Sequence, residues 1–233
     1  AAHGVCGVSA VTAVTAQSPA GITASHIVPA DVVAAQINTV ADDMPVVGVK
    51  TGMLASREIV AIVATIMQMR GLRPVVDPVL MSTSGTALLD RDAIELLTAR
   101  LLPLAAAVTP NMAEAEQLSG VTIRTLADTR VAASRIHGLG PATVIVTGGH
   151  FHFGNQTVVD VVHDGHDLLD DLRVVFPVGP HLEGVPDAGR FHLDDRQPTA
   201  GLDRLVETGV HLGRIAQVVI DPSHGDRGAA ANG

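Results

Sequence analysis

Residues 46–54 read VVGVKTGML, a short run of apolar residues that ends at Lys50-Thr51-Gly52 before two more apolar residues. A continuous apolar run of this length is typical of a strand that is buried on both faces, as in a parallel sheet. Residues 74–77, 106–109 and 143–147 contain similar runs. The four runs predict a sheet of mostly parallel strands.

Helical patterns separate these predicted strands. In one of them, Ile59, Ile62, Val63 and Ile66 are spaced to form a single apolar stripe that can pack on a sheet. The predicted helices cover residues 29–40, 56–70, 90–101, 111–118 and 125–137. Strands that alternate with helices predict an α/β fold with right-handed crossover connections.

The carboxyl ends of the predicted strands carry polar, Gly and Pro residues, in the segments 50–53, 77–79, 109–111 and 147–150. Ligands of open α/β sheets bind at the carboxyl ends of the strands. We therefore expect a ligand site along this rim of the sheet. The alternative is that these Gly and Pro residues only mark turns.

Composition narrows the possible class of protein. The length of 233 residues is compatible with one domain, and the apolar runs are too short for a membrane span. The net charge is −9 and Lys50 is the only lysine, which argues against a nucleic-acid partner. No signal peptide is visible, so we expect a cytoplasmic protein. With no Trp or Tyr and four Phe, the core must be aliphatic, and the single cysteine, Cys6, is expected to lie in it.

Several motifs, taken in order, resemble those of the hydroxymethylpyrimidine/phosphomethylpyrimidine kinases of thiamine biosynthesis, which are members of the ribokinase-like family. The resemblance extends from about residue 2 to about residue 173. The segments that carry it are 9–17 (SAVTAVTAQ), 49–54 (VKTGML), 76–79 (VDPV) with 83–85 (TSG), 109–115 (TPNMAEA), 148–150 (GGH) and 160–165 (DVVHDG).

The resemblance implies a ribokinase-like, three-layer α/β/α fold and a kinase that uses ATP and Mg²⁺ on a small pyrimidine, with homodimers common among relatives. Gln17, Met53 and Val79 match the residues that bind the pyrimidine. One carboxamide can meet the donors and acceptors on the edge of an aminopyrimidine ring. For Met53, ordinary core packing is the alternative.

The resemblance also implies a set of residues associated with the nucleotide and Mg²⁺, namely Asp77, Asn111, Glu114, Thr147 and Gly149. Asn111 and Glu114 match an Asn-x-x-Glu motif that supports the Mg²⁺ site through water, and the same spacing is that of a helix capping box. No direct metal ligand is assigned.

The sequence departs from the family at its phosphate-handling parts. Residues 1–10 lack the family's Gly-rich loop, no His-Gly-Thr-Gly-Cys motif follows residue 165, and Thr147 stands where a lysine is frequent. The fold is therefore expected to be incomplete at both ends, no catalytic residue is assigned, and catalysis is expected to be impaired. The alternatives are a binding-only or non-functional remnant of the family, or a pyridoxal kinase.

The expected division into domains follows from the position at which the family resemblance ends. Residues 1–175 are predicted to form the kinase core. Residues 176–233, in which Gly, Pro and His are scattered without a period, are predicted to be a divergent, poorly ordered tail of the kind that a frameshift would produce. Within this tail, Val218-Val219-Ile220 is a candidate strand, and the following residues 221–225 (DPSHG) are similar to the family's Gly-rich loop.

Overall fold

A computed structural model describes residues 6–18, 21–82, 85, 87–148 and 159–165, together with the backbone of 216–220. These residues fall into two compact units. The first unit holds the described residues up to 108, with 139–142 and 216–220, and the second holds 109–138, with 143–148 and 159–165. Within this described part, no helix is both long enough and apolar enough to cross a membrane.

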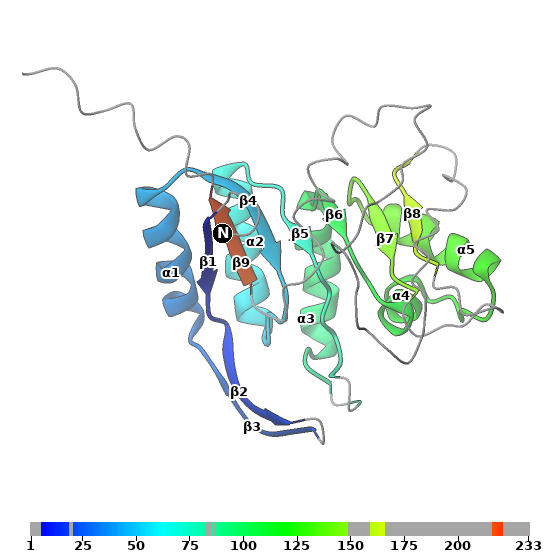
Figure 1. The fold of residues 1–233 in the computed structure, drawn as a ribbon, viewed down its shortest axis with the longest axis horizontal. Coiled ribbons are helices and arrows are strands. Elements are labelled where there is room, and N and C mark those ends of the chain that lie inside the picture. Colours follow the sequence, from blue (N-terminus) through cyan, green and yellow to red (C-terminus); the bar gives the residue numbers. More distant parts are fainter. Residues whose placement is uncertain are drawn as a thin grey trace, which may run out of the picture. The chain divides into compact units, whose positions relative to one another are not determined.

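The first unit contains five of the described strands of the main sheet, which can be followed in Figure 1. Their order across the sheet is β1 (Cys6–Ala10), β9 (Ala216–Ile220), β4 (Val46–Thr51), β5 (Val75–Val76) and β6 (Ala107–Val108). Strands β4, β5 and β6 are parallel, as the apolar runs predicted. Strand β9 is antiparallel to both of its neighbours, β1 and β4.

The helices of the first unit are α1 (Ala30–Asp43), α2 (Arg57–Arg70) and α3 (Arg91–Leu96). Helix α2 begins where the hydroxyl of Ser56 accepts a hydrogen bond from the N–H of Ile59, and it ends at Gly71, whose φ of 64° favours glycine.

The third helix is shorter than predicted. A continuous helix was expected over residues 90–101, but α3 is followed by a π-helical turn, Leu97–Leu101, and a 3₁₀ turn, Leu102–Leu104. Pro103 has no N–H to donate to the preceding turn, which accounts for the change of helix type before it.

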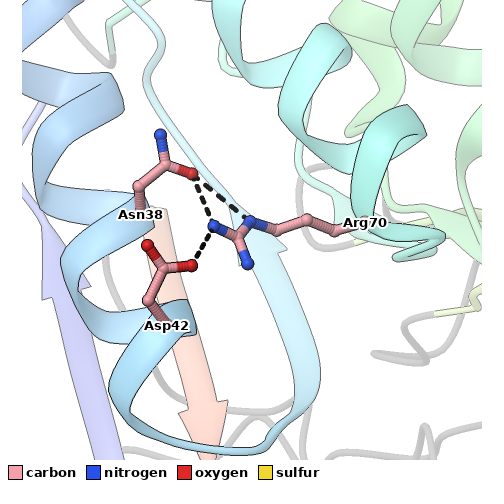
Figure 2. Close-up of polar contacts among 3 residues, drawn as sticks. All are labelled: Asn38, Asp42 and Arg70. Carbon is pink, nitrogen blue, oxygen red and sulfur yellow. Dashed lines mark hydrogen bonds and ion pairs between the residues drawn. The ribbon is translucent and has the colours of Figure 1, made fainter.

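A polar cluster joins helices α1 and α2 (Figure 2). Arg70, the last residue of α2, donates from Nη2 to Oδ1 of Asn38 over 2.8 Å and to Oδ1 of Asp42 over 2.6 Å. Its Nε also donates to Asn38, over 3.3 Å. Because Asn38 and Asp42 are one turn apart, the planar guanidinium group contacts both of them at once. This cluster fixes α1 against α2.

A β-hairpin follows β1. It consists of β2 (Ala13–Ser18) and β3 (Gly21–Ile27), which pair antiparallel in a separate two-stranded sheet, with a register shift between Ala16 and Gln17. Strands β1, β2 and β3 were not among the predicted strands. The expectation that Cys6 lies in the core was wrong: Cys6 is exposed at the start of β1, the outermost described strand of its sheet, in which only Ala10 is buried.

The second unit contains β7 (Val144–Val146) and β8 (Val161–His163), which pair antiparallel. Its helices are α4 (Met112–Ser119) and α5 (Leu126–His137), which contact each other. Both helices begin with a capping box, as described below for α4.

The core of the described residues is aliphatic, as the scarcity of aromatic residues predicted. Burying one such side chain contributes about 1.5–3 kcal/mol. The largest fully buried side chains include those of Ile59, Met67, Leu80, Leu97, Leu101 and Ile136. All four phenylalanines lie outside the described residues.

Candidate functional site

An ion pair joins the carboxyl ends of two neighbouring strands in the first unit. Lys50, near the end of β4, donates from Nζ to Oδ2 of Asp77 over 2.9 Å, and Asp77 directly follows β5. The N–H of Asp77 also donates to the carbonyl of Thr51 over 3.0 Å. The two side chains are 24% and 30% exposed, so the pair is accessible to a polar ligand at the rim. Asp77 is therefore at the strand end where the sequence predicted it.

The two other predicted residues of this unit are close to the same strand ends. Met53 is buried, at 8% exposure, just after β4. Val79 is half-buried, and its N–H donates to the carbonyl of Asp77 over 2.9 Å. The burial of Met53 is compatible with both of the roles considered for it, a wall for a flat ring and ordinary core packing.

A buried hydroxyl links the backbone of Met53 to the base of the hairpin. Thr12, which is 3% exposed, donates from Oγ1 to the carbonyl of Met53 over 2.6 Å. The carbonyl of Thr12 accepts from the N–H of Val28, where the hairpin returns. Strand β1 runs in the same direction as β4, since both are antiparallel to β9. The hairpin therefore begins at the carboxyl end of β1, on the same side of the sheet as the carboxyl end of β4, which carries Lys50.

Gln17 is exposed on this hairpin, in β2, beside the register shift. A residue of α1 fixes the connection that leads to it. Gln36 donates from Nε2 to the carbonyl of Val11 over 3.0 Å and accepts from the N–H of Val11 over 2.9 Å. The side-chain amide of Gln36 thus satisfies both backbone groups of Val11, one of the two residues between β1 and β2.

Three predicted nucleotide-associated residues come together in the second unit. The carbonyl of Pro110 accepts from the N–H of Thr147 over 2.9 Å, and Asn111 pairs with Thr147 in a short parallel bridge. Asn111 and Glu114 form a capping box at the start of α4. The Asn111 side chain accepts from the N–H of Glu114 over 3.0 Å, and the Glu114 carboxylate accepts from the N–H of Asn111 over 2.9 Å. The capping alternative considered for this motif is confirmed.

A carboxylate holds the backbone just after Thr147. Oδ1 of Asp160 accepts a hydrogen bond from the N–H of Gly148 over 2.8 Å. Burial raises the pKa of Asp160 above its ordinary value, and the hydrogen bond from Gly148 partly opposes that rise. A side chain at position 148 would collide with the backbone of Val159, because a Cβ there would lie 2.1 Å from the Val159 carbonyl oxygen. Only glycine fits at this strand end.

The predicted residues are thus found in two groups. Gln17, Met53, Asp77 and Val79 belong to the first unit, with Gln17 next to the turn of the hairpin, whereas Asn111, Glu114 and Thr147 belong to the second. Gly149 lies outside the described residues, as do His150 and the predicted motif residues Thr83 and Ser84.

Sequence reasoning did not assign a role to Thr12, Gln36 or Asp160. Thr12 and Asp160 are inside motifs that were noticed, but nothing in the sequence shows which backbone groups they contact. Gln36 lies on a predicted helix with no motif around it, and no sequence signal identified it.

Comparison with known proteins shows to which family this chain belongs. Residues 1–174 match the family model described as phosphomethylpyrimidine kinase. A hydroxymethylpyrimidine/phosphomethylpyrimidine kinase of Rhizobium meliloti is 43% identical over 169 residues, which cover 72% of this chain and 63% of that protein. The chain therefore spans less than two thirds of the length of this relative.

Solved structures are also similar to the chain. The phosphomethylpyrimidine kinase of Clostridium difficile 630 superimposes with a TM-score of 0.61 at 36% identity, covering 68% of each chain. An ADP complex of Bacillus subtilis pyridoxal kinase gives a TM-score of 0.64 at 31% identity and covers 75% of this chain and 65% of that one. The ribokinase-like α/β class predicted from the sequence is confirmed. By its match over most of its length, this chain belongs to the phosphomethylpyrimidine kinase family.

Proposed function

We propose that this chain supplies the pyrimidine-binding part and a portion of the nucleotide-binding part of a kinase that uses ATP and Mg²⁺. The substrate would be 4-amino-5-hydroxymethyl-2-methylpyrimidine or its phosphate, in thiamine diphosphate biosynthesis. The family match over residues 1–174 supports this proposal. The motif residues that the structure describes lie at the carboxyl ends of strands or on the adjoining hairpin. Such strand ends are where ligands of α/β sheets bind.

In the first unit, the proposed pyrimidine site consists of Gln17, Met53 and Val79. The exposed carboxamide of Gln17 would bind the ring edge by donating one hydrogen bond and accepting another. Met53 and Val79 would supply an apolar wall for the ring. The Lys50–Asp77 ion pair would hold the ends of β4 and β5 in register beneath the ligand.

In the second unit, Asn111, Glu114 and Thr147 are the proposed neighbours of the nucleotide phosphates. Their amide, carboxylate and hydroxyl oxygens have the chemistry that suits Mg²⁺ and its water ligands. A bound Mg²⁺ would neutralise phosphate charge. Asn111 and Glu114 would act through the fixed start of α4, and Asp160 would hold the backbone of Gly148 beside Thr147.

We expect such a kinase to work in the cytoplasm, where ATP is available, and to form a homodimer. A coupled assay of ATP consumption with the hydroxymethylpyrimidine and Mg²⁺ tests the activity. Turnover would support the kinase, whereas binding of the pyrimidine without turnover would support the binding-only alternative. That alternative is favoured by Thr147, which cannot supply the cation that a lysine would provide at this position.

Pyridoxal kinase is the second candidate, because a structure of that enzyme is among those similar to this chain. The same assay with pyridoxal in place of the pyrimidine separates the two. Gln17 favours the pyrimidine, whose edge offers the alternating donors and acceptors that a carboxamide meets.

A further inference from the structure

Two histidine rings from different elements pack against each other in the second unit. His137 is the last residue of α5, and His163 is the last residue of β8. The centroids of the two rings lie 4.7 Å apart, and the ring planes are inclined by 31°. Helix α5 and strand β8 contact each other, and Figure 1 shows them side by side. The histidine pair thus joins the end of the helix to the end of the strand.

The turn after β8 packs closely on the same pair. The N–H of Gly165 donates to Nδ1 of His163 over 3.1 Å. A Cβ on Gly165 would lie 2.9 Å from Cε1 of His137 and 3.1 Å from its Nε2. The φ of Gly165 is 89°, in the region that favours glycine. The backbone of the turn therefore lies as close to His137 as a residue without a side chain permits.

The hydrogen bond from Gly165 determines the protonation state of His163. A backbone N–H can only donate, so Nδ1 of His163 is the unprotonated, accepting nitrogen and the ring proton is on Nε2. A second proton would have to bind Nδ1, where it would face the N–H of Gly165. Protonation of His163 therefore breaks the hydrogen bond that holds the turn.

The same hydrogen bond argues against a metal site at the histidine pair. A metal ion on Nε2 of His163 would require the ring proton to be on Nδ1, which already accepts from Gly165. Within the part of the chain that the structure describes, no group of three or more His, Cys, Asp or Glu side chains could hold a metal ion. The gain and loss of a proton is the chemistry that suits the pair.

The surroundings of His163 favour its neutral form. Burial, followed by the nearby His137, lowers the pKa of His163 below its ordinary value of 6.5, and the charge of Asp164 partly opposes that change. If both rings carried a proton, two positive charges would be held 4.7 Å apart in a partly buried place. Acid should therefore separate the rings.

Other charged groups on the elements packed against β8 are directed elsewhere or lie further along the helix. Strand β7 contributes apolar residues, with Val144 opposite His163. The charged residues of α5 besides His137 are Asp128, Arg130 and Arg135. Asp128 caps the start of α5, Arg135 donates to the carbonyl of Ser119, and Arg130 precedes His137 by two turns.

We infer that the His137–His163 pair is a pH-operated restraint, which holds the end of β8 and its turn on α5 while His163 is neutral and releases them when His163 gains a proton. The direction follows from the lowered pKa. The contribution of neutral His163 to stability is complete above the unfolded pKa of about 6.5 and is lost as the pH falls through the folded pKa. The inference depends only on these contacts and does not require the proposed function.

Release of the restraint would also affect the strand end that carries Thr147. Strand β8 is only three residues long. Two buried residues separate His163 from Asp160, whose carboxylate accepts from the N–H of Gly148. Looser attachment of β8 to α5 should therefore weaken the hold of Asp160 on the backbone beside Thr147.

Hydrogen exchange of the full chain at about pH 7.5 and about pH 5, with each rate divided by the intrinsic rate at that pH, tests the inference. In the parent, protection of the amides of 161–165 should fall at least tenfold at the lower pH, while that of 57–70 in α2 stays constant. His163→Asn supplies Oδ1 as an acceptor in place of Nδ1 but does not titrate, so its protection should be equal at both pH values. The same substitution at the exposed His26 of β3 is the control and should leave the loss at 161–165 unchanged. Constant protection in the parent, or an equal loss in His163→Asn, would overturn the inference.

A second variant tests the repulsion between the rings. His137→Phe keeps a ring beside His163 but carries no charge, so protection at 161–165 should fall less than threefold. A tenfold loss in this variant would show that His137 has no part in the release. Protonation of Asp160, whose pKa burial raises, favours the folded state as the pH falls, so it has the opposite sign and does not mimic the predicted loss.

The effect on the strand end is tested at the lower pH by comparing the parent with His163→Asn, because Asp160 is the same in both chains. The amide of Gly148 should be at least three times better protected in His163→Asn. Equal protection of Gly148 in the two chains would contradict the connection from the histidine pair to this strand end.

Discussion

Nζ of Lys50 lies 2.9 Å from Oδ2 of Asp77, so the only lysine of the chain is paired with the acidic residue that follows the neighbouring strand. Both side chains are partly exposed, and solvent screening limits the contribution of such a pair to stability. Under the proposed function, its position at the strand ends gives the pair a larger effect on ligand binding than on folding.

The first prediction follows from this pair. Lys50→Met should lower the free energy of unfolding by no more than about 1 kcal/mol, measured by urea denaturation. Under the proposed function, it should weaken binding of the pyrimidine by a larger factor than this loss of stability explains. Arg91→Met is the control, because it removes an ion pair with Glu95 whose side chains are 90% and 66% exposed. Equal pyrimidine binding by the Lys50→Met chain and its parent would count against the pair having a role at the site.

The second prediction concerns the base of the hairpin. Gln36→Leu removes both hydrogen bonds to Val11 and should destabilise the protein by about 1 kcal/mol, because water can replace part of what is lost at this exposed backbone. Proteolysis within residues 13–27 should become faster, since the hairpin loses a restraint at its base. Gln68→Leu, on the exposed side of α2, should change neither property. If both variants were cleaved at the parent rate, Gln36 would not restrain the hairpin.

The third prediction compares the two capping boxes. Asn111→Ala and Thr125→Ala each remove a side-chain acceptor at a helix start, and each should cost about 1 kcal/mol of stability. Only Asn111→Ala should also weaken binding of ATP with Mg²⁺, measured by calorimetry, because Thr125 has no proposed contact with the nucleotide. Glu114→Gln keeps the helix start but removes the negative charge of the Glu114 side chain, and it should weaken nucleotide binding as well. Equal nucleotide affinity in all three variants would limit the Asn-x-x-Glu motif to a structural role.

The fourth prediction uses the raised pKa of Asp160, which results mainly from burial. A group whose folded-state pKa is raised contributes stability below its unfolded pKa of about 3.9 and loses that contribution as the pH rises through the folded pKa. Asp160→Asn should therefore gain stability relative to the parent as the pH is increased through this range and then level off. Urea midpoints at a series of pH values measure the difference.

Asp128 provides a control of opposite sign. The side-chain hydrogen bond from Thr125, followed by backbone bonds, lowers the pKa of Asp128. Its contribution is present above the unfolded pKa and disappears as the pH falls through the folded pKa, so Asp128→Asn should lose stability relative to the parent as the pH rises. If the Asp160 and Asp128 variants showed the same trend, the account of Asp160 as a carboxylate destabilised by burial would be wrong.

The sequence predicted the parallel core because its signals are local. Apolar runs such as 46–49, and helix starts such as Ser56 and Asn111, depend on neighbouring residues alone. The edge strand β1 and the hairpin β2–β3 lack a long buried run, so their pattern did not stand out. Val218-Val219-Ile220 was noticed as a candidate strand, but its place between β1 and β4 depends on pairing with residues about 200 positions away, which no local pattern contains.

The residues of the candidate site also differ in whether a local sequence signal or only the tertiary structure reveals their position. The positions of Asp77, Asn111 and Thr147 at strand ends follow from motif order, whereas the hydrogen bonds of Thr12, Gln36 and Asp160 depend on tertiary structure. The division into a core at 1–175 and a divergent tail at 176–233 stays a prediction, since most of the tail lies outside the described residues. Impaired catalysis likewise stays a prediction.

The most direct test of the proposed function is calorimetric titration of the chain with 4-amino-5-hydroxymethyl-2-methylpyrimidine, beside Gln17→Leu and the control Gln68→Leu. We expect the parent and Gln68→Leu to bind with the same affinity and Gln17→Leu to bind at least ten times more weakly, the equivalent of about 1.4 kcal/mol for the lost carboxamide contacts. Failure of the parent to bind the pyrimidine, or equal binding by Gln17→Leu, would contradict a pyrimidine site that includes Gln17 of the β2–β3 hairpin.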